Sequence, residues 1–148
     1  MIALRLVRLI EANSEKLSTG LLDKILTSDD TNAFRSVPRK ELECAVHEIY
    51  QHLSEWLLTK TESDIELRYT RLGERRASQG IPLSQWVWAI IVTKDHLWGF
   101  LQREAYVDGA VELFGELEFL RLLEQFFDRA VYYGTVGYER ASKKARAA

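Results

Sequence analysis

The feature that most constrains the fold is a run of seven consecutive apolar residues, from Trp86 to Val92. Gly80 and Pro82 stand just before this run. A glycine past a helix end, with a proline soon after it, is a strong stop signal. One helix is therefore predicted to end near Gly80, and another to begin after Pro82. A helix that is apolar on every side belongs in the middle of a bundle, so we place residues 83–105 at the centre of the fold.

Composition and charge narrow the class of protein. A chain of 148 residues is most simply one domain, and its net charge of −2 gives no electrostatic reason to bind nucleic acid or an anionic membrane. No segment approaches the roughly 18 apolar residues of a membrane span. Arg5 and Arg8 interrupt the apolar N-terminus, where a signal peptide would be continuous. The single cysteine, Cys44, suits a reducing cytosol, and we predict a cytoplasmic protein that binds neither nucleic acid nor membrane.

The spacing of apolar residues predicts the elements of the first half. Residues 2–26 carry a helical apolar face that Gly20 divides, and the polar residues 27–36 are predicted to be the longest loop. The helix that follows Pro38 has an apolar seam formed by Leu42, Val46, Ile49, Leu53 and Trp56. No segment shows the alternation of a strand. The predicted fold class is all-α, a bundle of five to six helices with a long C-terminal helix.

A third helix is predicted to begin at Thr61, which forms a capping box with Asp64. Its polar face ends in a cluster of arginines, namely Arg71, Arg75 and Arg76. Arg71 and Arg75 lie one turn apart, so these like charges need an acidic partner or solvent. We predict that at least one arginine pairs with a carboxylate on another segment, for which the candidates are Asp95 and Asp128. The alternative is a solvated face.

The last segment, residues 110–144, is longer than a small domain. If it is one helix, its 35 residues span roughly 52 Å, against the roughly 30 Å of such a domain. It must therefore either break, for example near Gly115, or project from the body. A stripe of small residues lets another helix approach closely, from the same chain or from a second copy: Ala130, Gly134, Gly137 and Ala141. Residues 139–148 lose the apolar stripe, so the domain is predicted to cover 1–138 and the linker or tail 139–148.

Catalytic and metal-binding patterns are poorly represented. His47 and His52 are five residues apart, whereas the zinc-protease helix needs a spacing of four to place both on one face. We find no nucleophile motif or phosphate loop. We therefore expect no enzyme activity, no metal site and no cofactor. A haem-binding alternative would use His96 and His47 as the axial ligands. The many aromatic residues form either a core or the lining of a ligand pocket.

The run from Arg71 to Ser84, RLGERRASQGIPLS, resembles the RsbRD-type N-terminal domains. The same likeness extends to Trp98 and to the aromatic segment 126–139, and it covers essentially the whole chain. The residues that match the motif are Arg71, Gly73, Glu74, Arg75, Arg76, Gly80, Pro82 and Trp98.

The resemblance implies a sensory or regulatory module. Such domains precede output domains such as the STAS domains of stressosome proteins, or histidine kinases. Related stressosome sensors have a globin-like fold without haem and form dimers. No binding residue carries over, because the ligands of the family are largely undefined. This chain ends before any output domain, so we expect either a stand-alone module or the sensor part of a longer protein.

Together these patterns predict a non-catalytic, cytosolic sensory domain. We expect it to form a homodimer and to relay a signal through its C-terminal helix to an output domain or signalling protein. The residues predicted for the dimer interface are Phe126, Ala130, Tyr133, Gly134, Gly137 and Ala141. The alternatives are a globin-like sensor that binds haem or a small ligand, and a stand-alone protein–protein adaptor.

Overall fold

A computed structural model of the chain describes residues 4–104 and 110–147. These residues contain helices and no strand, which confirms the all-α class. The elements are α1 (Leu4–Ala12), α2 (Ser14–Thr27), the 3-10 helix η1 (Asp29–Ser36), α3 (Arg39–Gln51), the π-helix η2 (Glu55–Thr59), α4 (Glu62–Ser78), α5 (Leu83–Glu104) and α6 (Ala110–Ala147).

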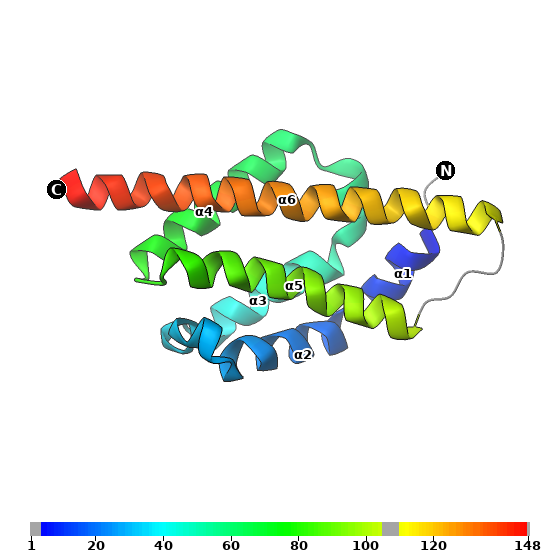
Figure 1. Ribbon diagram of the computed structural model, residues 1–148, viewed down its shortest axis with the longest axis horizontal. Helices are drawn as coiled ribbons and strands as arrows, with labels where there is room; N and C mark the ends of the chain where they lie inside the picture. Colours follow the sequence, from blue (N-terminus) through cyan, green and yellow to red (C-terminus); the bar gives the residue numbers. More distant parts are fainter. Residues whose placement is uncertain (1–3, 105–109, 148) are drawn as a thin grey trace.

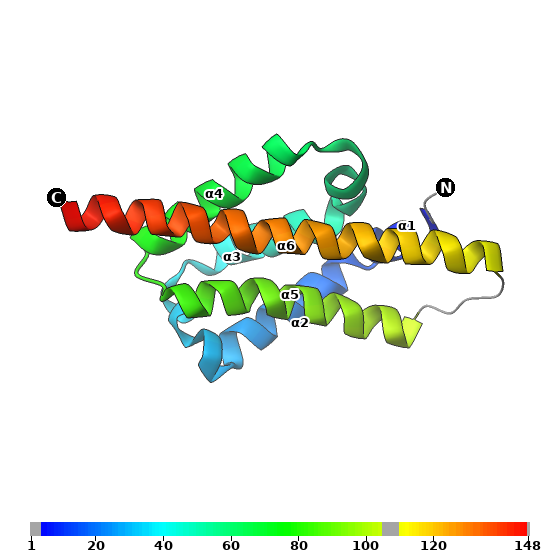
Figure 2. The ribbon, with the colours of Figure 1, turned by 45° about the horizontal axis from the view of Figure 1, so that its top comes forward.

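The long helix α6 runs along the whole molecule, and its C-terminal turns extend past the ends of α4 and α5 (Figure 1). Its most extensive contact is with α4. Helix α5 lies beside α6, and α2 packs on α5 from the other direction (Figure 2). The core fills the space between these helices, α3 and η1, and Tyr50, Leu53, Leu97 and Phe119 are among its completely buried residues.

Helix α5 is less enclosed than we predicted. It contacts α2, η1, α4 and α6, and it buries Trp86 among other residues. Trp88, two residues further on, is 41 % exposed, and Asp95 and Gln102 lie on the same open side. The neighbouring helices cover only part of the circumference of α5, so the seven-residue apolar run exceeds what they can bury. The expected end of this helix at residue 105 lies outside the described residues.

The predicted stop before Pro82 is confirmed, and its geometry is a Schellman motif. Helix α4 ends at Ser78, and Gly80 follows with a φ of +75°, a conformation that glycine adopts without steric cost. The Gly80 N–H donates to the Ala77 carbonyl, and the Ile81 N–H donates to the Arg76 carbonyl. These two bonds satisfy carbonyls at the helix end. The capping box at the start of α4 is also present, with Thr61 and Asp64 each accepting from the backbone of the other.

The segment predicted to be the longest loop is instead helical. Residues 29–36 form η1, because their side chains satisfy nearby backbone groups. The Thr31 hydroxyl donates to the Ile25 carbonyl, and the Arg35 side chain donates to the Leu26 carbonyl. Phe34 is buried in the core and anchors the segment. The prediction of a loop was based on the polar composition of this segment, which gave no weight to the one buried aromatic residue.

The N-terminal helices also divide at a different place. We predicted a division at Gly20, but α1 ends at Ala12 and α2 begins at Ser14. The Asn13 side chain donates to the Leu9 carbonyl, and this competes with continued helix. Gly20 lies inside α2, where an added Cβ would be 3.0 Å from the His96 ring. Gly20 therefore allows α2 to pack closely against His96 and does not interrupt the helix.

Helix α6 is continuous over 38 residues, from Ala110 to Ala147. At 1.5 Å per residue its length is about 57 Å. Of the two possibilities that its length left open, a break near Gly115 or projection from the body, the structure shows projection. The helix also passes through Gly134 and Gly137 without interruption.

The small residues of α6 lie where α4 crosses it. A Cβ added at Gly73 of α4 would overlap the backbone of Gly134, and one added at Gly137 would overlap the carbonyl of Thr70. The helix that approaches the stripe is therefore α4 of the same chain. Of the residues that we assigned to a dimer interface, Phe126, Ala130, Gly134 and Gly137 are buried within one chain. Tyr133 and Ala141 remain partly exposed.

The crossing generates a stability prediction. Gly73→Ala and Gly137→Ala should each destabilise the protein by about 2–4 kcal/mol. The added methyl group would meet backbone atoms of the facing helix, so the two helices would have to separate. Urea unfolding followed by circular dichroism measures this loss.

Gly99→Ala is the matched control inside α5. Among the described residues its Cβ would meet just the flexible end of Arg103, at 3.3 Å, and alanine is the better helix former by roughly 0.5–1 kcal/mol. This variant should be at least as stable as the original chain. Equal effects at Gly73, Gly137 and Gly99 would contradict the close crossing.

Candidate functional site

The most unusual residue of the core is an arginine. Arg76, on the last turn of α4, is only 2 % exposed and is among the largest fully buried side chains. Its guanidinium lies 5.8 Å from the centre of the Phe34 ring and 5.6 Å from that of Trp86. Cation–π contacts of this kind stabilise a cation that has lost its water. They do not replace a countercharge, which a buried cation also needs.

The countercharge is Glu41, in the first turn of α3. Arg76 Nη1 donates to Glu41 Oε2 at 2.7 Å, and Arg75 Nη2 donates to Glu41 Oε1 at 2.9 Å. Gln79 completes the cluster: its Nε2 donates to Glu41 at 2.8 Å, and its Oε1 accepts from Arg76 at 2.9 Å. The prediction that an arginine of this run pairs with another segment is confirmed. The suggested partners Asp95 and Asp128 were wrong, because the carboxylate that reaches Arg75 and Arg76 is Glu41 of α3.

The cluster shifts the ionisation of its members. The hydrogen bond from Arg75 is the largest of several effects that lower the pKa of Glu41 to about 2, against an opposing effect of burial. Burial lowers the pKa of Arg76, and the hydrogen bond with Glu41 opposes this change. Arginine stays protonated in proteins, so the cluster holds two guanidinium charges and one carboxylate near neutral pH.

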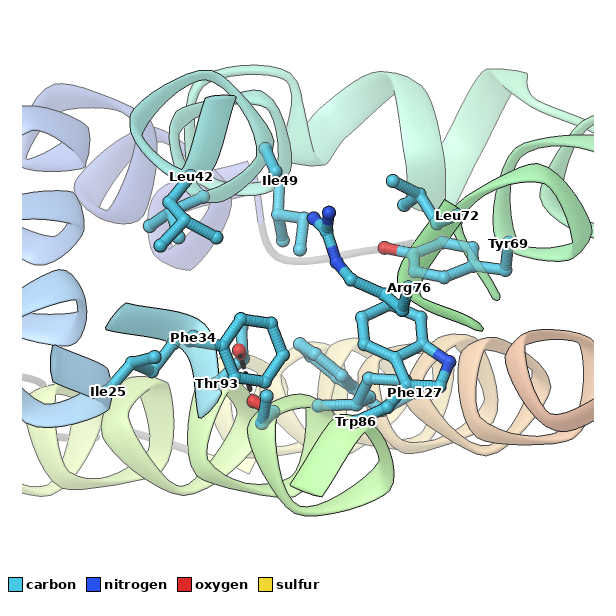
Figure 3. A pocket seen from close by; sticks show the side chains of 14 residues that line it. Ile25, Phe34, Leu42, Ile49, Tyr69, Leu72, Arg76, Trp86, Thr93 and Phe127 are labelled. Carbon is cyan, nitrogen blue, oxygen red and sulfur yellow. Dashed lines mark hydrogen bonds between the residues drawn. The ribbon is translucent and has the colours of Figure 1, made fainter. Parts of the chain in front are cut away.

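A cavity of about 60 Å³ adjoins Arg76 (Figure 3). Its lining comes from α2, η1, α3, α4, α5 and α6, and it is apolar except for Arg76, the Thr93 hydroxyl and Tyr69. The Thr93 hydroxyl already donates to the Ala89 carbonyl at 2.7 Å. Figure 3 shows Arg76 reaching between Ile49 on one side and Phe34 and Trp86 on the other. The aromatic residues thus form both a core and the wall of a pocket, the two possibilities that the sequence left open.

One polar atom at this cavity has no partner. The Nε–H of Arg76 is buried and makes no hydrogen bond within the part of the chain that the structure describes. A buried donor without an acceptor costs free energy, so each such atom in a native protein calls for an explanation. Here the donor belongs to a side chain that lines an unfilled volume, and the other lining residues are apolar except for Tyr69 and Thr93.

The two histidines of the haem alternative do not meet at this cavity. His96 is buried and lines a surface groove with α2, while His47 lines a different groove beside Arg39. The Leu17 carbonyl lies 3.1 Å from His96 Nε2 and must accept, so that nitrogen carries the proton. Burial is the main cause that lowers the pKa of His96. Neither histidine is among the described residues that line the cavity, which does not support an axial ligand there.

Five of the eight motif residues have a defined structural role. Gly73 lies at the crossing with α6, Gly80 ends α4, and Arg75 and Arg76 hold Glu41. The other motif residues Arg71 and Glu74 are exposed, as is Pro82, which directly precedes α5. Trp98 donates from its indole nitrogen to Glu124 of α6 at 2.8 Å.

A family comparison agrees with this arrangement. The model of the RsbT co-antagonist protein RsbRD N-terminal domain matches residues 15–148. The chain belongs to the RsbRD N-terminal domain family. Comparisons with curated proteins and with solved structures found no match. Membership of the RsbRD N-terminal family makes this a regulatory domain of the stressosome type. None of the helices within residues 4–104 and 110–147 combines the length and apolar character needed to cross a membrane.

Two parts of the site in this RsbRD N-terminal domain could not be read from the sequence. In the sequence nothing distinguishes Glu41 from the other glutamates, and it lies 35 residues from Arg76. The cavity depends on side chains from six elements. The sequence does show several arginines at one helix end. This density indicates that a carboxylate pairs with them but does not identify which one.

Glu41→Gln tests the charge cluster. This variant keeps the shape of Glu41 but leaves Arg76 buried without a countercharge, so the free energy of unfolding at pH 7 should fall by about 2–4 kcal/mol. The control is Glu43→Gln, which removes an exposed ion pair with Arg39 and should cost less than about 1 kcal/mol. Similar losses in the two variants would mean that Glu41 does not compensate a buried charge.

Acid titration provides a second measurement on the same variant. The pKa of Glu41 is depressed from 4.5 to about 2, so its stabilising effect is complete above pH 4.5 and is lost as the pH falls towards 2. The original chain and Glu41→Gln should therefore converge in stability over this window. A constant difference between them from pH 6 to pH 2 would contradict the assignment.

Proposed function

We propose that this domain is the non-catalytic input of a cytoplasmic stressosome-type regulator, and that it passes a signal through α6 to an output domain or signalling protein. The observation that carries the proposal is the path of α6, which runs from the core past the ends of the other helices. A continuous helix transmits a shift at one end to whatever is attached at the other. In this proposal residues 1–138 form the sensory domain, and residues 139–148 begin the linker.

Contacts with α6 come from the elements that enclose Arg76. The Trp86 indole N–H donates to the Gly134 carbonyl at 3.2 Å, and the Tyr138 hydroxyl donates to the Ile81 carbonyl at 2.7 Å. Gly73 lies against Gly134, one helical turn before Arg76 on α4. A change in the cavity that moves α4 or Trp86 would therefore act on α6 directly. This chain of contacts supports a relay from the cavity to α6.

A homodimer is part of the proposal, and it requires a surface other than the buried stripe. The outward face of α6 carries Leu117, which is 51 % exposed, and Tyr132, which is 64 % exposed. Polar residues lie between them: Arg121, Gln125 and Asp128. Apolar anchors within a polar surround are typical of non-obligate interfaces. Two-fold pairing along this face would place two α6 helices, and thus two linkers, side by side.

The haem alternative and the adaptor alternative gain no specific support. The binding of a small ligand is supported, because the cavity provides a volume and a hydrogen-bond donor without a partner. Such binding would complement the regulatory role, since an input domain needs a signal to detect.

Association is tested by sedimentation equilibrium. The original chain should sediment as a dimer at tens of micromolar, and Leu117→Glu with Tyr132→Glu should raise the dissociation constant by about tenfold or more, since two charges would be placed in an apolar contact. Leu67→Glu is the matched control, because Leu67 is 52 % exposed on α4, outside this face. It should associate like the original chain. A monomer at high micromolar concentration, or a double variant that dimerises normally, would refute the proposed interface.

A further inference from the structure

We propose that the cavity beside Arg76 binds a small aliphatic carboxylate, with the carboxylate on the Arg76 guanidinium and the alkyl group among the apolar walls. The inference deepens the sensory function proposed above and rests on it in one respect: binding acts as a signal only if α6 relays it. Three observations carry the proposal, namely the unpaired donor, the balance of charge and the size and lining of the cavity.

The unpaired donor points to an acceptor in the ligand. Arg76 presents five N–H groups in a planar fork, and Glu41 and Gln79 both use Nη1. Its Nε–H is buried and has no partner among the described residues. Carboxylates match the geometry of a guanidinium, and their hydrogen bonds to it are about twice as strong as bonds between neutral groups. A ligand oxygen at Nε would satisfy the atom that the protein leaves unsatisfied.

The balance of charge favours an anion over a neutral acceptor. Glu41 is shared between Arg75 and Arg76, so the cluster carries one positive charge in excess. The Arg75 side chain is exposed to water, whereas Arg76 is buried and shares its one countercharge, Glu41, with Arg75. Arg68, a further cation on α4, adds to the positive potential at Arg76. The electrostatic potential around the buried guanidinium at the wall of the cavity is therefore positive, which favours an anion.

The dimensions of the cavity restrict the alkyl group. A volume of about 60 Å³ holds roughly four or five water-sized groups. This corresponds to a carboxylate with two to four carbons in total. The apolar part of the lining includes Leu42, Val46, Ala89, Ile90 and Phe127. They offer no second polar group to a longer or more polar molecule, and they favour a short apolar tail.

Nuclear magnetic resonance provides a local readout, with propionate as the probe. Trp86 lines the cavity and donates its indole N–H to the Gly134 carbonyl, whereas Trp88 is on the open side of α5. Propionate should shift the signals of the Trp86 indole and of Arg76 Nε–H in a saturable manner and leave Trp88 unchanged. Propionamide has nearly the same shape without the charge, and it should bind about tenfold or more weakly. Octanoate should bind more weakly than propionate, because its chain exceeds the cavity.

Two variants separate the charge from the volume. Arg76→Met should bring propionate and propionamide to within about twofold of each other, whereas Arg75→Met, which alters the exposed partner of Glu41, should preserve the preference. Ala89→Val should weaken both ligands, since it fills the cavity without touching the guanidinium. If Arg76→Met does not fold, the comparison of the three ligands on the original chain still decides the question.

Absence of a saturable Trp86 shift, equal binding of propionate and propionamide, or tighter binding of octanoate would overturn the proposal. The titration reads binding in each chain separately. A failure of dimerisation would therefore leave its result unchanged, and a failure to bind propionate would leave the dimer interface intact.

Discussion

The close crossing of α4 and α6 is the constraint on which the rest of the structure depends. Gly73 and Gly137 permit two backbones to touch where any side chain would keep them apart. Because the helices meet at this distance, the side of α4 that carries Gly73 is buried, and Arg76, one turn further on, lies on the same side. The burial of that arginine then requires Glu41 from α3, and the two contacts together join three helices around one end of the domain.

The same arrangement explains how the occupancy of a small cavity could affect α6, the helix that extends out of the domain. Trp86 forms part of the cavity wall and also donates to the Gly134 carbonyl of α6. Ile81, directly after the Schellman turn, accepts from Tyr138. Elements that close the cavity are thus bonded to the helix that leaves the domain. Interfaces of packed helices tend to switch between discrete arrangements, and a ligand that fills or empties the cavity would bias them.

The features that were predicted correctly from the sequence are those that depend on neighbouring residues. The capping box at Thr61, the stop at Gly80 and the all-α class depend on residues close together in the chain, and all are present. The sequence also located the small residues of α6, but a stripe of that kind does not tell which helix will occupy it. The partner of Arg76 and the exposure of Trp88 depend on how distant helices are arranged. The 3-10 segment was missed because Phe34 alone distinguishes it from a loop.

The central claim is that the Arg76–Glu41 cluster and the α4–α6 crossing act as one unit. Amide hydrogen exchange of the original chain and of Glu41→Gln, at a pH where both are folded, tests it most directly. The account predicts faster exchange in the second half of α4 and in residues 134–138 of α6, with little change in α2. Unchanged exchange in α6, or an equal increase in every helix, would contradict it.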